Sequence, residues 1–336
     1  MTEDRRDIGY WDLVIGHLNF DHMLAYLIRR LLLAIPVVFV VAAGVFLLLY
    51  LTPGDPASVI LGPDASPQRI AELRQQLGLD QPVAIQVARW FGRLFHGDLG
   101  QSIYLNLPVI QTIRDRAEPT LMLTLLATLF AILLGLPIGI LSATRAGSWF
   151  DLGAMLVALG GISMPSFWVG LNLIFVFAVL IGVLPVAGYQ PISKGLWEHL
   201  RYLLMPAITL GFAQAALIAR MARSLMLDVL REDYVRTARS KGVGEQKVVL
   251  SHALRNAMVP LVTVMGLTFA ILMGGAVITE QVFNIPGIGR LLVQSVLRRD
   301  YPVVQGIVLV IAINYVLINL CVDILYGWFD PRVRHS

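Results

Sequence analysis

The chain has 336 residues, of which 57% are hydrophobic and only 14% are charged, and its mean hydropathy is +0.73. A water-soluble domain carries about 25% charged residues, so this composition excludes an ordinary soluble protein and predicts an integral membrane protein. The formal net charge is +4. In a membrane protein such an excess is a topology signal, and we predict a lipid bilayer, and no nucleic acid, as its partner. Cys321 is the single cysteine, so no intrachain disulfide can form.

Six apolar segments are long enough to cross a bilayer as helices, which takes about 20 residues. They run over 31–51, 119–142, 151–183, 203–222, 258–280 and 304–326. The third is too long for one straight helix and contains Gly160, Gly161 and Pro165, so it could be one kinked helix or two spans. Uncharged polar residues also lie in the spans, and we expect them to form interhelical hydrogen bonds rather than to line a pore. They are Asn172, Gln214, Asn314 and Asn319.

The positions of the main basic segments favour six spans over seven. With six, the basic segments at Arg29–Arg30, at Arg145, over 220–257 and in the C-terminal tail all lie on one side of the membrane. Because cationic loops stay in the cytoplasm, we predict six spans with both termini cytoplasmic. The predicted division is a cytoplasmic N-terminal segment (1–30), a first span (31–51), a periplasmic subdomain (52–118), a transmembrane core of five spans (119–326) and a cytoplasmic tail (327–336). Residues 1–23 have no assigned role.

The segment 52–118 is predicted to be a small helical subdomain rather than a linker. Ser66-Pro67 is a helix start and Gly78 a helix end, and a second amphipathic helix is expected from Gln81 to His96. The subdomain could be a lid packed on the ends of the spans, or it could contact a soluble carrier of the substrate.

The chain lacks the residues that catalysis or ion coupling would need. Lys194 and Lys241 are each followed by glycine and Lys247 by valine, so there is no Gly-Lys-Ser/Thr phosphate-binding sequence. One function open to a membrane protein of this kind is that of an ion-coupled secondary carrier, and such carriers place ionisable residues at mid-membrane. The predicted spans have no ionisable residue well inside them, so this alternative is disfavoured. The histidines are scattered without metal-ligand spacing, and Ser163 has no histidine partner that would support intramembrane proteolysis. We predict no catalytic residue, no metal and no cofactor.

The segment 219–260 is polar and strongly basic, and long apolar segments flank it on both sides. Asp233 is expected to cap a short helix that Gly242 ends, and residues 245–257 are expected to form a second helix leading into the fifth span. Two short helices joined at a glycine make a compact cytoplasmic projection that carries Arg236, Arg239 and Lys241. Such a loop could be only a topology signal, or it could be a docking surface for a soluble partner.

The sequence of this loop, REDYVRTARSKG followed by HALRNAMVP, resembles the cytoplasmic coupling loop of binding-protein-dependent ABC importer permeases, in the B-type dipeptide/oligopeptide/nickel branch. Further segments are similar to that branch in order: LTPGDPA, HGDLGQS, GISMPSFWVGLNLIF, LLMPAITLG, VFNIPGIGR and FDPRVR. The resemblance covers about residues 24–334. The general family loop reads EAA-xxx-G. Here only Ala238 and Gly242 match it, and Arg236 stands where the family has glutamate.

The resemblance implies a fold, a function and partners. The fold is an all-α integral membrane protein of six transmembrane helices, with a periplasmic insertion after the first span and a coupling-helix loop, about 226–257, between the fourth and fifth. The function is that of an inner-membrane permease subunit, with ATP hydrolysis in separate subunits. The partners are a second homologous permease, two ATP-binding subunits and a periplasmic or extracellular solute-binding protein. The substrate class stays open among dipeptides, oligopeptides, glutathione, nickel chelates and sugars.

Two groups of site residues follow. Coupling to an ATPase is assigned to Arg236, Thr237, Ala238, Arg239, Lys241 and Gly242. A translocation path or hinge is assigned to Gly160, Gly161, Met164 and Pro165, with close helix packing as the alternative for the glycines.

Overall fold

The computed structural model describes residues 20–51, 55–62, 64–76 and 78–329. These residues form helices joined by turns and contain no β-strand, which confirms the all-α prediction. The helices are α2 (Phe20–Leu51), α3 (Pro56–Leu61), α4 (Pro67–Gln76), α5 (Val83–Phe95), α6 (Val109–Thr144), α7 (Trp149–Ser163), α8 (Ser166–Leu173) with a π-helical extension (Ile174–Leu180), a 3-10 turn (Ile192–Lys194), α9 (Leu196–Leu230), α10 (Asp233–Ser240), α11 (Glu245–Lys247) with a π-helical segment (Val248–Ala253), α12 (Leu254–Val282), α13 (Ile288–Leu297) and α14 (Tyr301–Phe329). Most of the predicted N-terminal segment and tail lies outside the described residues.

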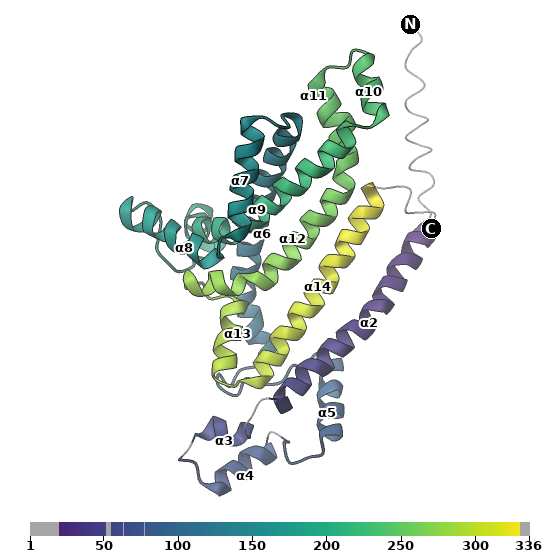
Figure 1. Cartoon of the computed structure of the whole chain (residues 1–336). Coiled ribbons are helices and arrows are strands. Elements are labelled where there is room, and N and C mark those ends of the chain that lie inside the picture. Colours follow the sequence, from purple (N-terminus) through teal and green to yellow (C-terminus); the bar gives the residue numbers. More distant parts are fainter. Residues whose placement is uncertain (1–19, 52–54, 63, 77, 330–336) are drawn as a thin grey trace.

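Five helices in the described part of the chain are long and apolar enough to cross a membrane, and one bent pair of helices makes a sixth candidate. The five run over Ile28–Leu47, Val109–Thr144, Leu196–Leu230, Glu245–Val282 and Tyr301–Val322. They overlap the first, second, fourth, fifth and sixth predicted spans. Figure 1 shows α10 and α11 at one end of this bundle and α3, α4 and α5 at the other, hereafter the α10 end and the α5 end.

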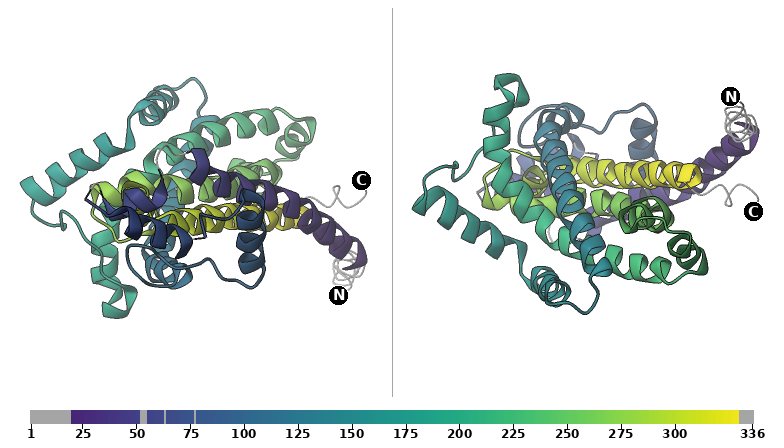
Figure 2. Two further views of the ribbon diagram at one scale, coloured as in Figure 1. Left: turned by 90° about the horizontal axis from the view of Figure 1, so that it is seen from below. Right: turned by 90° about the horizontal axis from the view of Figure 1, so that it is seen from above.

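The third predicted span is a broken helix. α7 ends at Ser163 and α8 begins at Ser166, and the two axes differ by 105°. Pro165 explains the break, because it has no N–H to donate and it forces the preceding residue out of the helical conformation. Met164 accordingly has φ −81° and ψ 132°. In both views of Figure 2, α8 and its extension point away from the other helices, and large apolar side chains such as Trp168 are exposed there.

α6 and α9 pack closely because small residues face each other. A Cβ atom added to Gly139 of α6 would lie 2.5 Å from the carbonyl oxygen of Ala219 and 2.6 Å from Cβ of Ala222. One added to Gly211 of α9 would lie 2.5 Å from the carbonyl oxygen of Ala127. Small residues let helix backbones approach within lipid, where the hydrophobic effect does not drive association. Gly139 and Gly211 therefore permit the close packing of α6 on α9.

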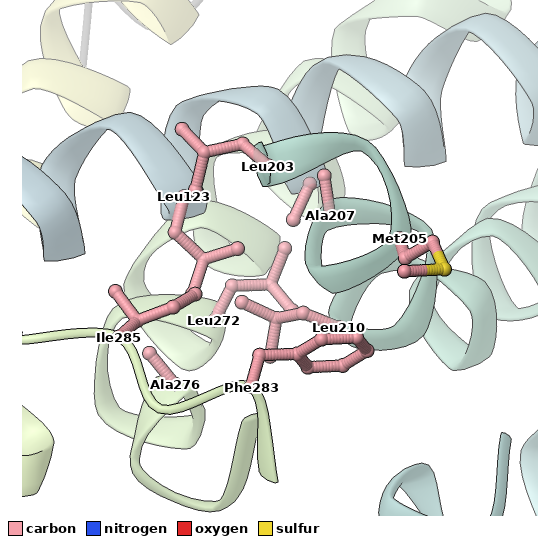
Figure 3. Close-up of a cluster of buried hydrophobic side chains, with 10 residues drawn as sticks. Leu123, Leu203, Met205, Ala207, Leu210, Leu272, Ala276, Phe283 and Ile285 are labelled. Carbon is pink, nitrogen blue, oxygen red and sulfur yellow. The ribbon is translucent and has the colours of Figure 1, made fainter. Parts of the chain in front are cut away.

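The main hydrophobic core joins α6, α9 and α12 to the turn that follows α12. Leu123, Leu210, Leu272 and Phe283 are buried together in this core, and Figure 3 shows their side chains converging from those elements. The turn, whose Ile285 is also fully buried, leads into α13. The chain after α12 is thus a buried turn followed by a short helix.

At the α5 end, α3, α4 and α5 form a small helical group attached to α2. Asp55 accepts a hydrogen bond from the backbone N–H of Ser58 at the start of α3 (3.1 Å) and pairs with Arg74 of α4 (3.1 Å). Trp90 of α5 packs against Phe46 of α2, with ring centroids 5.7 Å apart. α4 and α5 occupy the two segments predicted to be amphipathic helices.

A buried carboxylate connects the start of α14 to the segment before α6. Asp300 is 3% exposed and accepts hydrogen bonds from Oγ of Ser102 (2.5 Å) and from the backbone N–H of Ile103 (3.1 Å). The guanidinium of the nearby Arg298 stacks on the ring of Tyr104 at 3.8 Å from its centroid. These contacts join two segments that are almost 200 residues apart in sequence.

The prediction of interhelical hydrogen bonds from amides is wrong at two positions. The amide of Asn172 donates to the carbonyl of Trp168 (2.8 Å), and the amide of Asn314 donates to the carbonyl of Val310 (2.9 Å). Both bonds stay within one helix, four residues back, because a short amide side chain can reach its own backbone without a partner helix.

Candidate functional site: the loop between α9 and α12

The loop begins where the long helix α9 ends. The chain turns at Glu232, which has φ −64° and ψ 145°, and α10 starts at Asp233. The prediction that Asp233 caps this helix is wrong. Glu232 holds the N-cap position and makes no side-chain cap bond, while Asp233 is already helical and pairs loosely with Arg236 (3.7 Å). Aspartate is preferred at N-cap positions, but the non-helical N-cap conformation lies one residue earlier, at Glu232.

Gly242 ends α10 in the way predicted for it. Its φ is +79°, the left-handed conformation that glycine adopts without strain. The N–H of Gly242 donates to the carbonyl of Arg239 (2.9 Å), and the N–H of Val243 donates to that of Ala238 (3.2 Å). This pair of bonds is a Schellman motif. An added Cβ would meet no atom within 4 Å, so the backbone conformation alone requires glycine here.

Buried side chains hold the loop on the bundle. Val235 of α10 and Val248, which follows α11, are both fully buried. Beneath them, Met226 of α9 and Ala253 of the π-helical segment belong to one buried cluster that reaches α6 and α12. We therefore define the coupling projection as α10, the Gly242 turn and α11. Its base is part of the core, so it should move as a rigid extension of α9 and α12.

An ion pair closes the coupling projection across the turn. Arg239 of α10 donates to both carboxylate oxygens of Glu245 of α11, from Nε at 3.0 Å and from Nη2 at 2.7 Å. These hydrogen bonds raise the pKa of Arg239. A second contact joins α10 to α12, where the amide of Asn256 donates to the hydroxyl of Tyr234 (2.7 Å). The sequence pattern indicated cations here but did not reveal that one of them is paired within the loop.

The structure places all six predicted coupling residues on this projection. Arg236, Thr237, Arg239, Lys241 and Gly242 are exposed, and Ala238 is half-buried. The side chain of Arg236 is 73% exposed, and no hydrogen bond or ion pair is found for the side chain of Lys241 in the part of the chain that the structure describes. Arg236 and Lys241 can therefore offer positive charge to a partner, whereas the charge of Arg239 is already matched by Glu245.

A buried ion pair beside the projection was not predicted. Arg223 of α9 donates from Nε to Oδ1 of Asp151 in α7 (2.5 Å) and from Nη2 to Oδ2 (2.7 Å). Asp151 is 1% exposed and also accepts a bond from the N–H of Gly147 (2.9 Å). The sequence places Asp151 near the end of a span but contains no signal that pairs it with a residue 72 positions away. The pair fixes α7 to the helix that carries the projection.

The other predicted group lies at the α7–α8 junction, which Figure 1 places well away from α10. Gly161 is buried, and a Cβ there would lie 3.1 Å from the ring of Phe212 in α9, so this glycine permits close packing. Met164 is 41% exposed and Pro165 is also exposed. A Cβ at Gly160 would meet only the end of Met164, at 4.0 Å. The structure therefore does not bring the two predicted groups together.

A second buried carboxylate, Glu280, was also not singled out from the sequence. It is fully buried at the α5 end of α12, accepts a hydrogen bond from Oγ1 of Thr120 (2.6 Å), and accepts another from the N–H of Arg290 (2.7 Å). Thr120 in turn accepts a bond from the N–H of Ile288 (2.8 Å). This network joins α6, α12 and α13. Within the described residues, no three histidine, cysteine or acidic side chains lie close enough to hold a metal ion.

Comparisons with known proteins agree with this architecture. Residues 135–335 match the model of the family "Binding-protein-dependent transport system inner membrane component", and residues 23–124 match the model of its N-terminal region. A solved structure described as an inward-facing conformation of the MetNI methionine ABC transporter is similar in fold, with a TM-score of 0.55. It shares 20% sequence identity, and the similar region covers 66% of this chain and 97% of that one.

Two curated relatives are similar over nearly the whole chain. A Brucella abortus protein named for a peptide transport system permease and the glutathione transport system permease protein GsiC of Salmonella typhimurium are each 48% identical over 314 residues. In both cases the match covers 94% of this chain and 100% of the relative. The chain therefore belongs to the family of binding-protein-dependent transport system inner membrane components.

Proposed function

We propose that this chain is the membrane-spanning permease subunit of an ATP-driven importer for peptides or similar small solutes. The observation that carries the proposal is the 48% identity to permeases of peptide and glutathione transport systems over their full length. The similarity extends over 314 residues, which is 94% of this chain. The proposal gives the chain a transport role without catalysis of its own.

The proposed orientation places the α10 end in the cytoplasm and the α5 end outside. Five basic residues of the loop at the α10 end are exposed: Arg231, Arg236, Arg239, Lys241 and Lys247. Cationic loops stay on the cytoplasmic side. α2 begins and α14 ends towards the same end of the bundle (Figure 1), which would put both termini in the cytoplasm. The segment 52–118, with α3, α4 and α5, would then form the external subdomain of an inner-membrane protein.

Coupling to ATP hydrolysis is assigned to the coupling projection. Its buried base joins the ends of α9 and α12, so a force on α10 would reach two membrane helices directly. Arg236 and Lys241 would contact the ATP-binding subunit, while Arg239 and Gly242 would keep the projection in shape. Through Arg223 and Asp151 the motion of α9 would also reach α7.

The remaining partners follow from the same assignment. They are a second homologous permease, two ATP-binding subunits, an external solute-binding protein and the lipid bilayer. Transport would proceed by rigid-body alternation between inward-facing and outward-facing arrangements. The junction of α7 and α8, with Gly160, Gly161, Met164 and Pro165, would be a hinge or part of the translocation path.

Energy coupling gives the test. Cells or vesicles carrying the complete transporter should take up a radiolabelled dipeptide when ATP is present, and uptake should persist when the proton gradient is collapsed at constant ATP. An ATP-driven permease needs no ion gradient, whereas a secondary carrier does. Uptake that disappears with the gradient at full ATP would contradict the proposal and favour an ion-coupled carrier.

A further inference from the structure

A cleft of about 670 Å³, lined by both polar and apolar side chains, lies at the α5 end, between α5, the end of α4 and the first turn of α14. One of its walls is a face of α5, where Arg89 and Arg93 are four residues apart and therefore point to the same side, followed by His96. Tyr301 and Gln305 of α14 also line the cleft. No function described above uses these residues.

Two polar side chains of this cleft have no hydrogen-bond partner in the part of the chain that the structure describes, and the hydroxyl of one of them is fully buried. Gln305 is 8% exposed, and no hydrogen bond is found for its amide. The hydroxyl of Tyr301 is buried and also has no hydrogen-bond partner. Buried polar groups in native proteins almost always have partners, because an unmade bond costs free energy. A bound molecule that hydrogen-bonds to Gln305 and Tyr301 would remove that cost.

The charges of the cleft favour an anion. Arg89 and Arg93 are exposed, and neither forms an ion pair within the described residues. The acidic residue among those lining the cleft is Asp98, which already accepts a hydrogen bond from the N–H of Gly100 (2.8 Å). Two guanidinium groups against one carboxylate leave a net positive site, and guanidinium groups bind carboxylates with two parallel hydrogen bonds.

We propose that this cleft binds short peptides at the outer surface of the permease, with Arg89 and Arg93 holding the free C-terminal carboxylate. The proposal rests on the proposed function and adds a site for the cargo. A short peptide has a carboxylate, amide groups and apolar side chains. The carboxylate fits the guanidinium groups, the amide groups fit Gln305 and Tyr301, and an apolar side chain fits the indole of Trp90. A volume of about 670 Å³ is within the usual range for small-molecule sites. A phospholipid, by contrast, needs a continuous apolar groove for its acyl chains.

The floor of the cleft is rigidly connected to the membrane core. Gly306, next to Gln305, packs so closely on α6 that an added Cβ would lie 2.5 Å from Cγ1 of Val109. Asp300, two residues before Pro302, is held by Ser102 and Ile103. The cleft therefore lies where α6 and α14 begin, on the side from which an importer receives its cargo.

The test measures peptide binding without the external binding protein. The full chain with its co-purifying subunits, reconstituted in nanodiscs, is dialysed against radiolabelled dialanine, trialanine or glutathione, and against dialanine amide. At least one free-carboxylate peptide should bind, and dialanine amide should bind more weakly. Arg93→Gln and Gln305→Leu should each raise the dissociation constant roughly three- to tenfold, the range for losing a partly solvated hydrogen bond to a charged group. Arg69→Gln, the same charge change on α4 outside the cleft, should bind as the wild type does.

The outcomes separate this proposal from the proposed function. If the wild type imports peptides with its binding protein and ATP, but the two cleft variants bind peptide as well as the wild type, the cleft proposal is wrong and the importer function stands. Absence of binding for all three peptides would also overturn it. If Arg93→Gln instead lowers only the amount of phospholipid that co-purifies, the cleft is a lipid site and the proposal fails.

Discussion

Arg223 of α9 and Asp151 of α7 form a two-point ion pair whose carboxylate is almost completely buried. The pair lies at the α10 end, within two turns of the end of the helix that carries the coupling projection. A buried carboxylate is stable as an ion only when charge and hydrogen bonds surround it, and here Arg223 and the N–H of Gly147 supply both. The two residues therefore fix the position of α7 relative to α9.

Replacing Asp151 should loosen this connection. Asp151→Asn leaves the partly buried Arg223 without its counter-charge, and we expect a loss of about 2 kcal/mol in stability, somewhat below the value for fully buried pairs because Arg223 is 29% exposed. Thermal unfolding in detergent measures the loss. Glu198→Gln is the control, because it breaks the exposed pair with Arg201 (3.9 Å) and leaves the bond from Arg201 to the carbonyl of Val183 in place; it should change stability by less than about 0.5 kcal/mol. Equal effects of the two variants would show that the Asp151 pair has no special role.

The close packing of α6 on α9 gives a second prediction. Gly139→Leu cannot be accommodated without separating the helices, because even a Cβ would lie 2.5 Å from the carbonyl oxygen of Ala219. Overpacking of this kind costs about 1–3 kcal/mol or more, so the variant should accumulate poorly in the membrane. Gly153→Leu in α7, where a Cβ would meet no atom within 4 Å, should accumulate normally. Normal accumulation of both variants would contradict the packing described.

Topology can be tested with single cysteines. In a Cys321→Ser background, Glu72→Cys in α4 and Gln246→Cys in α11 place thiols at exposed positions at opposite ends of the bundle. In intact cells, a membrane-impermeant maleimide should label the cysteine at 72 and not the one at 246, and disruption of the membrane should make both reactive. Gln246 is chosen rather than Glu245 because Glu245 is bonded to Arg239. Labelling of both sites in intact cells would be incompatible with the proposed orientation.

The features that could be predicted from the sequence are local ones. Hydropathy located the membrane helices, and the glycine at 242 predicted a left-handed turn that the structure has. Pro165 predicted an interruption of the third span, although not an angle of 105°. Each of these depends on the residue and its immediate neighbours, whose backbone preferences act over a few positions.

The features that escaped prediction depend on distant residues. Asp151 meets Arg223, Asp300 meets Ser102 and Glu280 meets Thr120, at separations of 72, 198 and 160 residues. Whether such distant residues come into contact depends on how the helices pack, and helix packing cannot be read from a single sequence. Hydropathy also underestimated the lengths of α6 and α9, because each helix continues through polar residues beyond its apolar segment.

The coupling projection is the centre of the proposed function, and Gly242 is the position where its shape can be changed without touching a membrane helix. At φ +79° a β-branched residue is strained by about 1–2 kcal/mol, so Gly242→Val should distort the turn. Gly244, two residues later, has φ −59° and equally open surroundings, so Gly244→Val makes the same chemical change without strain. Gly242→Asn should retain most of the function, because asparagine tolerates the left-handed conformation.

The most direct measurement is co-purification of the ATP-binding subunit together with peptide uptake in vesicles, for the wild type and these three variants. The account predicts that Gly242→Val inserts into the membrane in normal amounts but loses both the ATP-binding subunit and uptake, while Gly244→Val and Gly242→Asn keep them. Wild-type uptake and wild-type subunit binding by Gly242→Val would show that the loop is only a topology signal and would contradict the proposed coupling role.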